Sequence, residues 1–110
     1  MYTRFITSMF AVLVAGSISL MFAGGVCAAQ PGGEALFKQH CSVCHVDGGN
    51  LISPQKTLHK KDREANNIKS AAAIVKLMRN PGPGMTTFNE KTISEKDAKA
   101  IAQYILKTFK

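Results

Sequence analysis

The sequence contains no tryptophan and only three cysteines among its 110 residues. Cys27 lies in an uncharged N-terminal stretch, so the rest of the chain holds a single close pair, Cys41 and Cys44. One pair cannot form the disulfide framework that stabilises many small exported domains. The sequence also lacks segments that alternate apolar and polar residues like a strand over more than a few positions. The pattern therefore predicts an all-α domain with long loops.

Charge is missing from the N-terminus, where Arg4 is the only charged side chain before Glu34. Residues 5–26 are apolar or small throughout, and the tripeptides "VCA" and "CAA" end at Ala28 and Ala29. A basic start, an apolar stretch and a small-residue cleavage site are typical of a secretory signal peptide.

We therefore predict a signal peptide at residues 1–29 and one exported, periplasmic domain at residues 30–110. The alternatives are an uncleaved membrane anchor and a lipid on Cys27, which would tether the domain to a membrane on the periplasmic or outer-membrane side. A domain of about 80 residues buries a modest core and often needs a disulfide, a metal or a cofactor for stability.

Acidic residues are half as frequent as basic ones, with 7 Asp and Glu against 14 Lys and Arg. Removing the signal peptide takes away Arg4 and no acidic residue, which leaves a net charge of +6. Such a charge favours encounter with partner proteins that have acidic docking surfaces. We expect an exported protein of this kind to be a monomer that binds no nucleic acid.

Apolar spacing predicts a short first helix at about residues 33–41. Residues 46–55 are rich in turn residues and predict a loop. The strongly charged residues 56–67 are expected to hold one helical turn at most.

Two further helices are predicted from their capping residues. Ser70 is a good N-cap for a helix that must end before Pro81. Ser94 and Asp97 form a variant of the capping box that opens the last helix. The last helix has one apolar side, made of Ala98, Ile101, Ala102, Ile105 and Phe109.

The sequence "CSVCH" at residues 41–45 could serve three kinds of site. A structural zinc ion needs four protein ligands, and the chain has no second cysteine pair to supply them. His45 and the distant His59 would complete only an irregular zinc site. A thiol–disulfide centre with this spacing belongs to folds with a βαβ unit, for which the sequence has no strands.

The third interpretation, a c-type haem attachment site, explains each residue of the motif. Cys41 and Cys44 would add across the two haem vinyl groups as thioethers, because their spacing places both sulfur atoms on one side of a helical turn. His45 follows directly, so its imidazole can bind the iron from the proximal face. Haem is attached in this way outside the cytoplasm, which agrees with the predicted export. We therefore predict one covalently bound haem c.

A second protein ligand would make the iron an electron-transfer centre, whereas His alone would leave it open to small molecules. The candidates are Met78, Met85, His40 and His59. Met78 belongs to an apolar helical stripe, His40 adjoins the attachment motif, and His59 lies in a charged run. Met85 lies in "NPGPGMTTF", where prolines and glycines can hold a side chain against the haem. We predict Met85 as the sixth ligand, which raises the reduction potential relative to two histidines.

On these motifs the chain resembles class I c-type cytochromes, and more narrowly the cytochrome c6-like group. "CHVDGGNLISPQKTL", "LMRNPGPGMTTF" and "ISEKDAKAIAQYIL" resemble its Gly/Asn-rich loop, methionine loop and final helix. The resemblance implies three to four short helices around one haem, and a one-electron carrier of a respiratory or photosynthetic chain rather than an enzyme. A weaker resemblance links the chain to small monohaem cytochromes of metal-respiring bacteria. The competing function is a haem sensor or weak peroxidase, in which Met85 dissociates.

The resemblance also implies particular contacts within the domain. Phe37 is expected to pack near Tyr104, and the carbonyl of Pro54 or a neighbour is expected to accept a hydrogen bond from His45. The sequence departs from the family at Thr86, where the residue after the methionine is usually proline, so the loop is less constrained.

Basic and amide side chains are expected around the exposed edge of the haem. The resemblance suggests Arg79, Lys56 or Asn50 near the haem propionates. Lys38, Lys56 and Lys91 are expected around the haem edge, where they would steer acidic redox partners.

Overall fold

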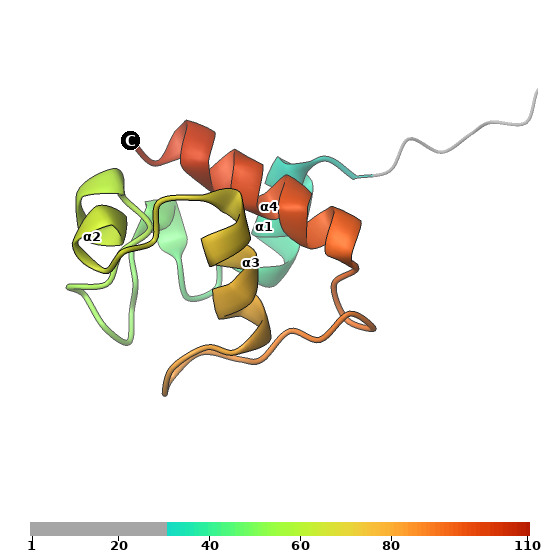
Figure 1. Ribbon diagram of the computed structural model, residues 1–110, viewed down its shortest axis with the longest axis horizontal. Helices are drawn as coiled ribbons and strands as arrows, with labels where there is room; N and C mark the ends of the chain where they lie inside the picture. The colour runs from blue at the N-terminus through green and yellow to red at the C-terminus, as the bar shows by residue number, and fades with distance from the viewer. Residues whose placement is uncertain (1–30) are drawn as a thin grey trace, which may run out of the picture.

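The computed structural model describes residues 31–110, and the predicted signal peptide and Cys27 lie outside the described residues. Within this part the regular elements are all helical, which confirms the predicted all-α class (Figure 1). None of these helices is long and apolar enough to cross a membrane. The elements in order are α1 (Gly33–His40), the 3-10 turn η1 (Val46–Gly48), α2 (Lys60–Ala65), α3 (Ala71–Arg79) and α4 (Glu95–Thr108).

Helix α4 lies at the centre of the core and packs against both α1 and α3 (Figure 1). Its first turn is capped as predicted, since the N–H of Asp97 donates to Oγ of Ser94 at 3.1 Å. The side that was predicted to be apolar is the buried side, with Ala98, Ile101, Ala102 and Ile105.

Aromatic rings join α1 to α4. The ring centroids of Phe37 and Tyr104 lie 5.3 Å apart, as expected, and Phe37 also lies 5.4 Å from Phe109. The two helices approach closely at Gly33, where an added Cβ would overlap the carbonyl oxygen of Ala100. The absence of a side chain at Gly33 therefore lets the start of α1 rest on α4.

The charged segment forms a longer helix than the sequence predicted. Helix α2 has six residues, whereas one turn at most was expected. The physical reason is Arg63, whose side chain turns inward and donates to the carbonyl groups of Leu58 and Phe109. The partner at Phe109 is remote in sequence, so the local pattern gave no sign of it.

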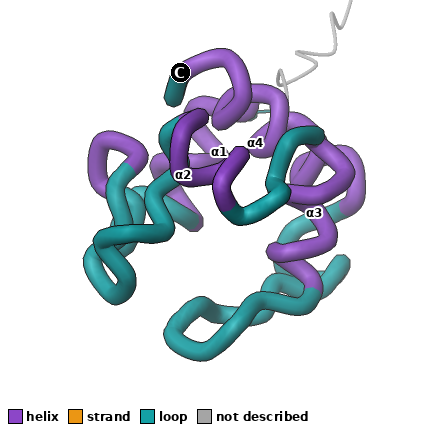
Figure 2. Tube along the Cα trace, turned by 60° about the vertical axis from the view of Figure 1, so that its left-hand side comes forward, coloured by secondary structure: helices purple, strands orange, loops and turns teal. Residues whose placement is uncertain are grey.

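Helix α3 begins and ends near the predicted positions. The N–H of Ala73 donates to Oγ of the N-cap Ser70 at 3.1 Å, and the helix stops two residues before Pro81. The loops at residues 49–59 and 80–94 then lie on the same side of the helices (Figure 2).

Arg79 anchors the second of these loops. Its Nη1 donates to the carbonyl oxygens of Phe88 at 2.9 Å and Ile93 at 2.8 Å. Its Nη2 lies 3.3 Å from a carboxylate oxygen of Glu95. The end of α3, the loop and the start of α4 are therefore tied together by one guanidinium group.

Candidate functional site

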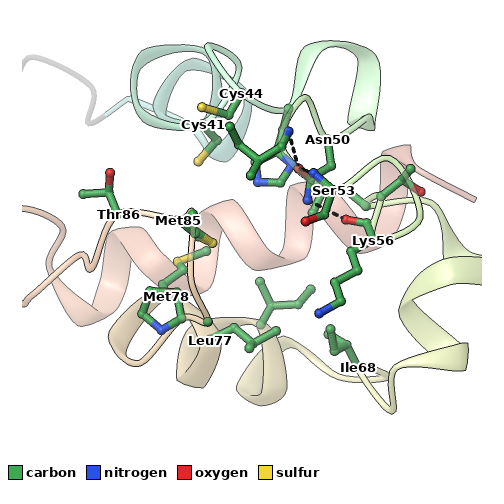
Figure 3. A pocket seen from close by; sticks show the side chains of 18 of the residues that line it. Cys41, Cys44, Asn50, Ser53, Lys56, Ile68, Leu77, Met78, Met85 and Thr86 are labelled. Carbon is green, nitrogen blue, oxygen red and sulfur yellow. Dashed lines mark hydrogen bonds between the residues drawn. The ribbon is translucent and has the colours of Figure 1, made fainter.

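A cavity of about 400 Å³ lies between the two loops and helices α3 and α4. This volume falls within the range of roughly 300–1,000 Å³ that is common for small-molecule and cofactor sites. Cys41, Cys44, His45 and Met85 all line it, and Figure 3 shows how the sulfur-bearing side chains are placed around it. Residues some forty positions apart in the chain thus meet at one cavity, as the haem hypothesis requires.

The lining divides into an apolar part and a polar part. The polar side chains outside the cysteine motif come mainly from the segment between η1 and α3, with Asn50, Ser53, Lys56, Thr57, Asp62 and Arg63. Apolar side chains come mainly from α3, the loop after it and α4, with Ile74, Leu77, Met78, Pro81, Phe88 and Ile105. The cavity is therefore suited to a mostly apolar group with polar substituents on the side of residues 50–63.

The two cysteines lie on a turn that continues from α1. The N–H groups of Cys44 and His45 donate to the carbonyl of Cys41 at 3.2 and 2.9 Å, and this turn places both thiols in the cavity wall (Figure 3). The two thiols are free and do not form a disulfide. Burial raises the pKa of the Cys41 thiol to about 11, whereas redox-active cysteines have a lowered pKa.

The side-chain chemistry also argues against a zinc ion. Within residues 31–110, no group of three or more His, Cys, Asp or Glu side chains is placed to hold a metal ion. A structural zinc site uses four such ligands. The interpretation of residues 41–45 as half of a zinc site is therefore not supported.

The imidazole of His45 is oriented by a backbone carbonyl. Its Nδ1 lies 2.7 Å from the carbonyl oxygen of Gly49, and because a carbonyl can only accept, Nδ1 must carry the proton. In the neutral imidazole this leaves the lone pair of Nε2 available for a metal. The expectation of Pro54 or a neighbour as the acceptor was wrong, because η1 (Val46–Gly48) folds the chain back directly after His45 and presents Gly49 instead.

Met85 lies in the loop after α3, and its side chain is 38% exposed. The preceding Gly84 has a φ of +91°, which favours glycine, and an added Cβ would lie 2.7 Å from Cγ2 of Ile52. Gly84 therefore lets the two loops approach each other at the residue before the methionine. The N–H of Met85 lies 3.5 Å from the carbonyl of Gly82, at the limit of a hydrogen bond.

The remaining ligand candidates have other surroundings. His40 is half-buried in the cavity wall, with its ring 6.2 Å from that of Phe88 in an edge contact. His59 is exposed, lies against Phe109 and does not line the cavity. Met78 is buried in the core, as predicted, but it also lines the cavity, which the helical pattern alone did not indicate.

Of the basic and amide residues expected near the haem, only some line the cavity. Asn50 and Lys56 line the cavity. Arg79 does not, because its guanidinium is directed to the end of the loop and to α4. Lys38 pairs with Glu34 on the exposed side of α1, away from the cavity lining, and Lys91 is also absent from that lining.

Asn50 shapes the first loop. Its Oδ1 accepts from the N–H groups of Ile52 and Ser53 at 3.0 and 2.8 Å, and its Nδ2 donates to the carbonyl of Lys56 at 2.9 Å. Sequence reasoning missed Arg63, which lines the same cavity. The only sequence signal was its place in a charged run, which resembled a solvated surface.

These features fit a haem. The donors on the cavity wall include the imidazole of His45 with a free Nε2, the thioethers of Met78 and Met85, and two free thiols. The apolar part of the wall suits a porphyrin ring, and the polar part suits its carboxylates. A cofactor of this size would also supply the buried apolar surface that a domain of about 80 residues otherwise lacks.

Comparisons with known proteins agree with this chemistry. The family described as "Cytochrome C oxidase, cbb3-type, subunit III" matches residues 28–105. Cytochrome c6 of Cyanidium caldarium is 39% identical over 74 residues, which cover 67% of this chain and 66% of that protein. Cytochrome c6 of Pyropia yezoensis is 32% identical over 99 residues, which cover 90% of this chain and 86% of the relative.

Solved structures give the same result for the fold. OmcF, outer membrane cytochrome F from Geobacter sulfurreducens, is 44% identical with a TM-score of 0.70, over 72% of this chain and 100% of its own. Cytochrome c6C from Synechococcus sp. PCC 7002 is 30% identical with a TM-score of 0.66, over 70% and 93%. Cytochromes c6 are electron carriers with one covalently bound haem c, and this chain belongs to the cytochrome c6 family of class I c-type cytochromes.

Proposed function

We propose that the protein is a one-electron carrier whose haem c is held by Cys41 and Cys44 and ligated by His45 and Met85. The observation that supports this most directly is that all four side chains line one cavity, although Met85 lies forty residues beyond His45. Membership of the cytochrome c6 family supports the electron-carrier activity. The residues that line the cavity of this chain support the particular set of iron ligands.

Each residue has a distinct role in this proposal. Cys41 and Cys44 would hold the haem as thioethers, because each S–H can add across one vinyl group with formation of a C–S bond and no leaving group. Nε2 of His45 binds the iron, because its Nδ1 proton is engaged by Gly49. When bound, the haem supplies a one-electron Fe(III)/Fe(II) couple.

Met85 provides the second axial ligand. Its thioether is neutral and soft, so it stabilises ferrous iron and raises the reduction potential relative to a second imidazole. With His45 and Met85 both bound, the iron would be held by two separate segments of the chain. That arrangement would limit rearrangement between the oxidation states and would favour fast electron transfer.

We propose that the protein works in the periplasm, in a respiratory or photosynthetic chain, and meets partners with acidic docking surfaces. The signal-like pattern at residues 1–29 and the net charge of +6 that remains without it support this. A lipid on Cys27 would place the same domain at a membrane surface.

A pyridine haemochrome spectrum combined with the intact mass of the exported protein tests these proposals. One haem per chain, with a mass increase of one haem that survives denaturation, is expected. The same mass reveals where the signal is cut and whether Cys27 carries lipid. A colourless protein made in cells that attach haem normally would refute the haem site.

A second candidate function is a haem sensor or weak peroxidase in which Met85 leaves the iron. Two observations favour it: the side chain of Met85 is 38% exposed, and Thr86 stands where a proline would stiffen the loop. Rapid carbon monoxide binding to the reduced wild-type protein would support this function. A reduced protein that does not bind carbon monoxide would support the electron carrier.

A further inference from the structure

Arg63 is a buried cation. It belongs neither to the haem-attachment motif nor to the proposed axial ligands, so the proposed function does not yet explain its position. It is 4% exposed and is the only polar or charged residue in the buried set of residues 31–110. Burying a charge is costly unless the charge is paired and hydrogen-bonded. The position of Arg63 therefore requires a compensating partner.

Within the described residues, backbone carbonyls accept hydrogen bonds from this guanidinium, but no carboxylate forms an ion pair with it. Nε donates to the carbonyl of Leu58 at 2.7 Å, and Nη2 donates to the carbonyl of Phe109 at 3.2 Å. The ion pairs formed within the described chain do not include Arg63. Its neighbour Asp62 instead accepts from Oγ1 of Thr57 at 2.5 Å.

Arg63 lies in the polar part of the cavity wall, beside Asn50, Ser53 and Lys56. A haem is amphipathic, with an apolar ring and two propionate carboxylates at one edge. The apolar lining comes mainly from α3, the loop after it and α4. The carboxylate edge is therefore expected at the segment that carries Arg63, where a buried guanidinium can bind a carboxylate with two parallel N–H groups.

We propose that Arg63 pairs with one haem propionate and keeps it ionised, and that the positive charge of Arg63 raises the reduction potential by offsetting the negative charge of that carboxylate. This inference rests on the proposed haem site. An adjacent cation favours the ionised form of a carboxylate. A buried cation in the wall of the haem cavity also favours the ferrous state, since that state carries one positive charge less. Lys56 is exposed in the same wall. It would pair more weakly with the other propionate, because solvent screens an exposed charge.

The first test is a titration of the wild-type holoprotein in which the propionate carboxyl carbons carry ¹³C. An ordinary carboxylic acid titrates at a pH of about 4, so we expect one propionate signal to remain constant from about pH 8 to about pH 4. Two signals that both titrate within that range would overturn the inference. His40, Lys56 and Asp62 line the cavity and His59 lies against Phe109, so Asp62→Asn and His59→Gln variants are titrated in parallel to remove their contributions.

The second test is the reduction potential of three variants at neutral pH. Arg63→Gln is expected to shift the ferric/ferrous equilibrium about tenfold toward ferric, which is 59 mV for one electron. Arg63→Lys loses the two-pronged hydrogen-bond geometry but keeps the charge, so its potential should stay within about twofold of the wild type. Lys61→Gln removes a charge from the exposed face of the same helix and should also stay within about twofold, because exposed charges are screened.

A purely structural Arg63 would give a different pattern. Arg63→Gln and Arg63→Lys would then both lose stability, and both would keep the wild-type potential, which would overturn the inference. If Arg63→Gln does not fold, the titration of the wild-type holoprotein still tests whether one propionate is held ionised. Haem content separates this result from the proposed function: a chain without covalent haem contradicts the haem site, whereas a holoprotein whose propionates both titrate normally contradicts only the role of Arg63.

Discussion

The imidazole of His45 donates from Nδ1 to the carbonyl oxygen of Gly49 over 2.7 Å. This contact selects the tautomer in which Nε2 can bind a metal, and it fixes the plane of the ring. The acceptor is a backbone atom held by η1, so it does not depend on the rotamer of another side chain. The proposed proximal ligand is thus oriented by the same turn that follows the two cysteines.

Replacing His45 with alanine is expected to abolish stable haem binding. Partners that only orient a metal ligand are already worth about 10–100-fold in affinity, so losing the ligand should lower the haem content at least as much. The haem content is measured by pyridine haemochrome on the purified chain. His59→Ala is the control, because His59 is exposed and outside the cavity lining. Equal haem losses in the two variants would contradict the assignment.

Replacing Met85 with alanine is expected to open the sixth position of the iron. The reduced variant should bind carbon monoxide, the weak red absorption band that marks Met–iron ligation in the ferric form should vanish, and the potential should fall. Met78→Leu is the matched control, because it is a volume-conserving change of a buried thioether that usually costs less than about 1.5 kcal/mol. A red band that disappears in Met78→Leu and survives in Met85→Ala would reassign the ligand to Met78.

Local signals predicted most of the fold. Ser70 and Ser94 begin helices because their side-chain oxygens accept from backbone N–H groups, and Pro81 ends one through its effect on the preceding backbone. Apolar spacing alone identified the buried side of α4. The candidate ligands were also predicted from sequence, because "CSVCH" is a contiguous motif and Met85 lies in a loop of exceptional composition.

Contacts between distant residues could not be predicted in this way. Arg63 is buried because its guanidinium reaches the carbonyl of Phe109, 46 positions further along the chain. Arg79 leaves the cavity because the carbonyls of Phe88 and Ile93 lie beside the end of α3. A charged residue in a charged run gives no local sign of such partners, so its burial depends on the folded chain.

Gly33→Ala is expected to destabilise the protein by about 1–3 kcal/mol, the usual cost of overpacking. The new Cβ would overlap the carbonyl oxygen of Ala100 and push α1 away from α4, although alanine is the better helix former. Gly32→Ala is the control, since no atom lies within 4 Å of its added Cβ. Denaturant unfolding of the ferric protein measures the free energy of unfolding of both variants. A loss for Gly33→Ala no larger than for Gly32→Ala would show that α1 can move away freely.

The net charge is expected to make electron transfer depend on ionic strength. With a small anionic oxidant the rate should fall as salt is added, and with a cationic oxidant it should rise, because the screening length shrinks to about 10 Å at 0.1 M. Lys56→Gln should reduce the salt dependence more than Lys107→Gln, since only Lys56 lines the cavity. Stopped-flow rates that do not change with salt would refute electrostatic steering.

Arg79→Ala is expected to loosen the methionine loop and to lower stability by about 2–4 kcal/mol, because hydrogen bonds to a charged group contribute about 1.5–3 kcal/mol each. The carbonyls of Phe88 and Ile93 lose their shared donor at 2.9 and 2.8 Å. Thermal unfolding measures the loss, and the red absorption band shows whether Met85 leaves the iron before the helices unfold.

Glu95→Gln separates this effect from the ion pair that Arg79 also forms at 3.3 Å. An exposed pair of this kind contributes about 0–1 kcal/mol, so Glu95→Gln should keep nearly the wild-type stability and the wild-type absorption band. Arg79→Lys should recover only part of the loss, because an ammonium group cannot place two N–H donors in the fixed geometry of a guanidinium. Equal destabilisation by Glu95→Gln and Arg79→Ala would assign the effect to the ion pair and leave the loop without its proposed anchor.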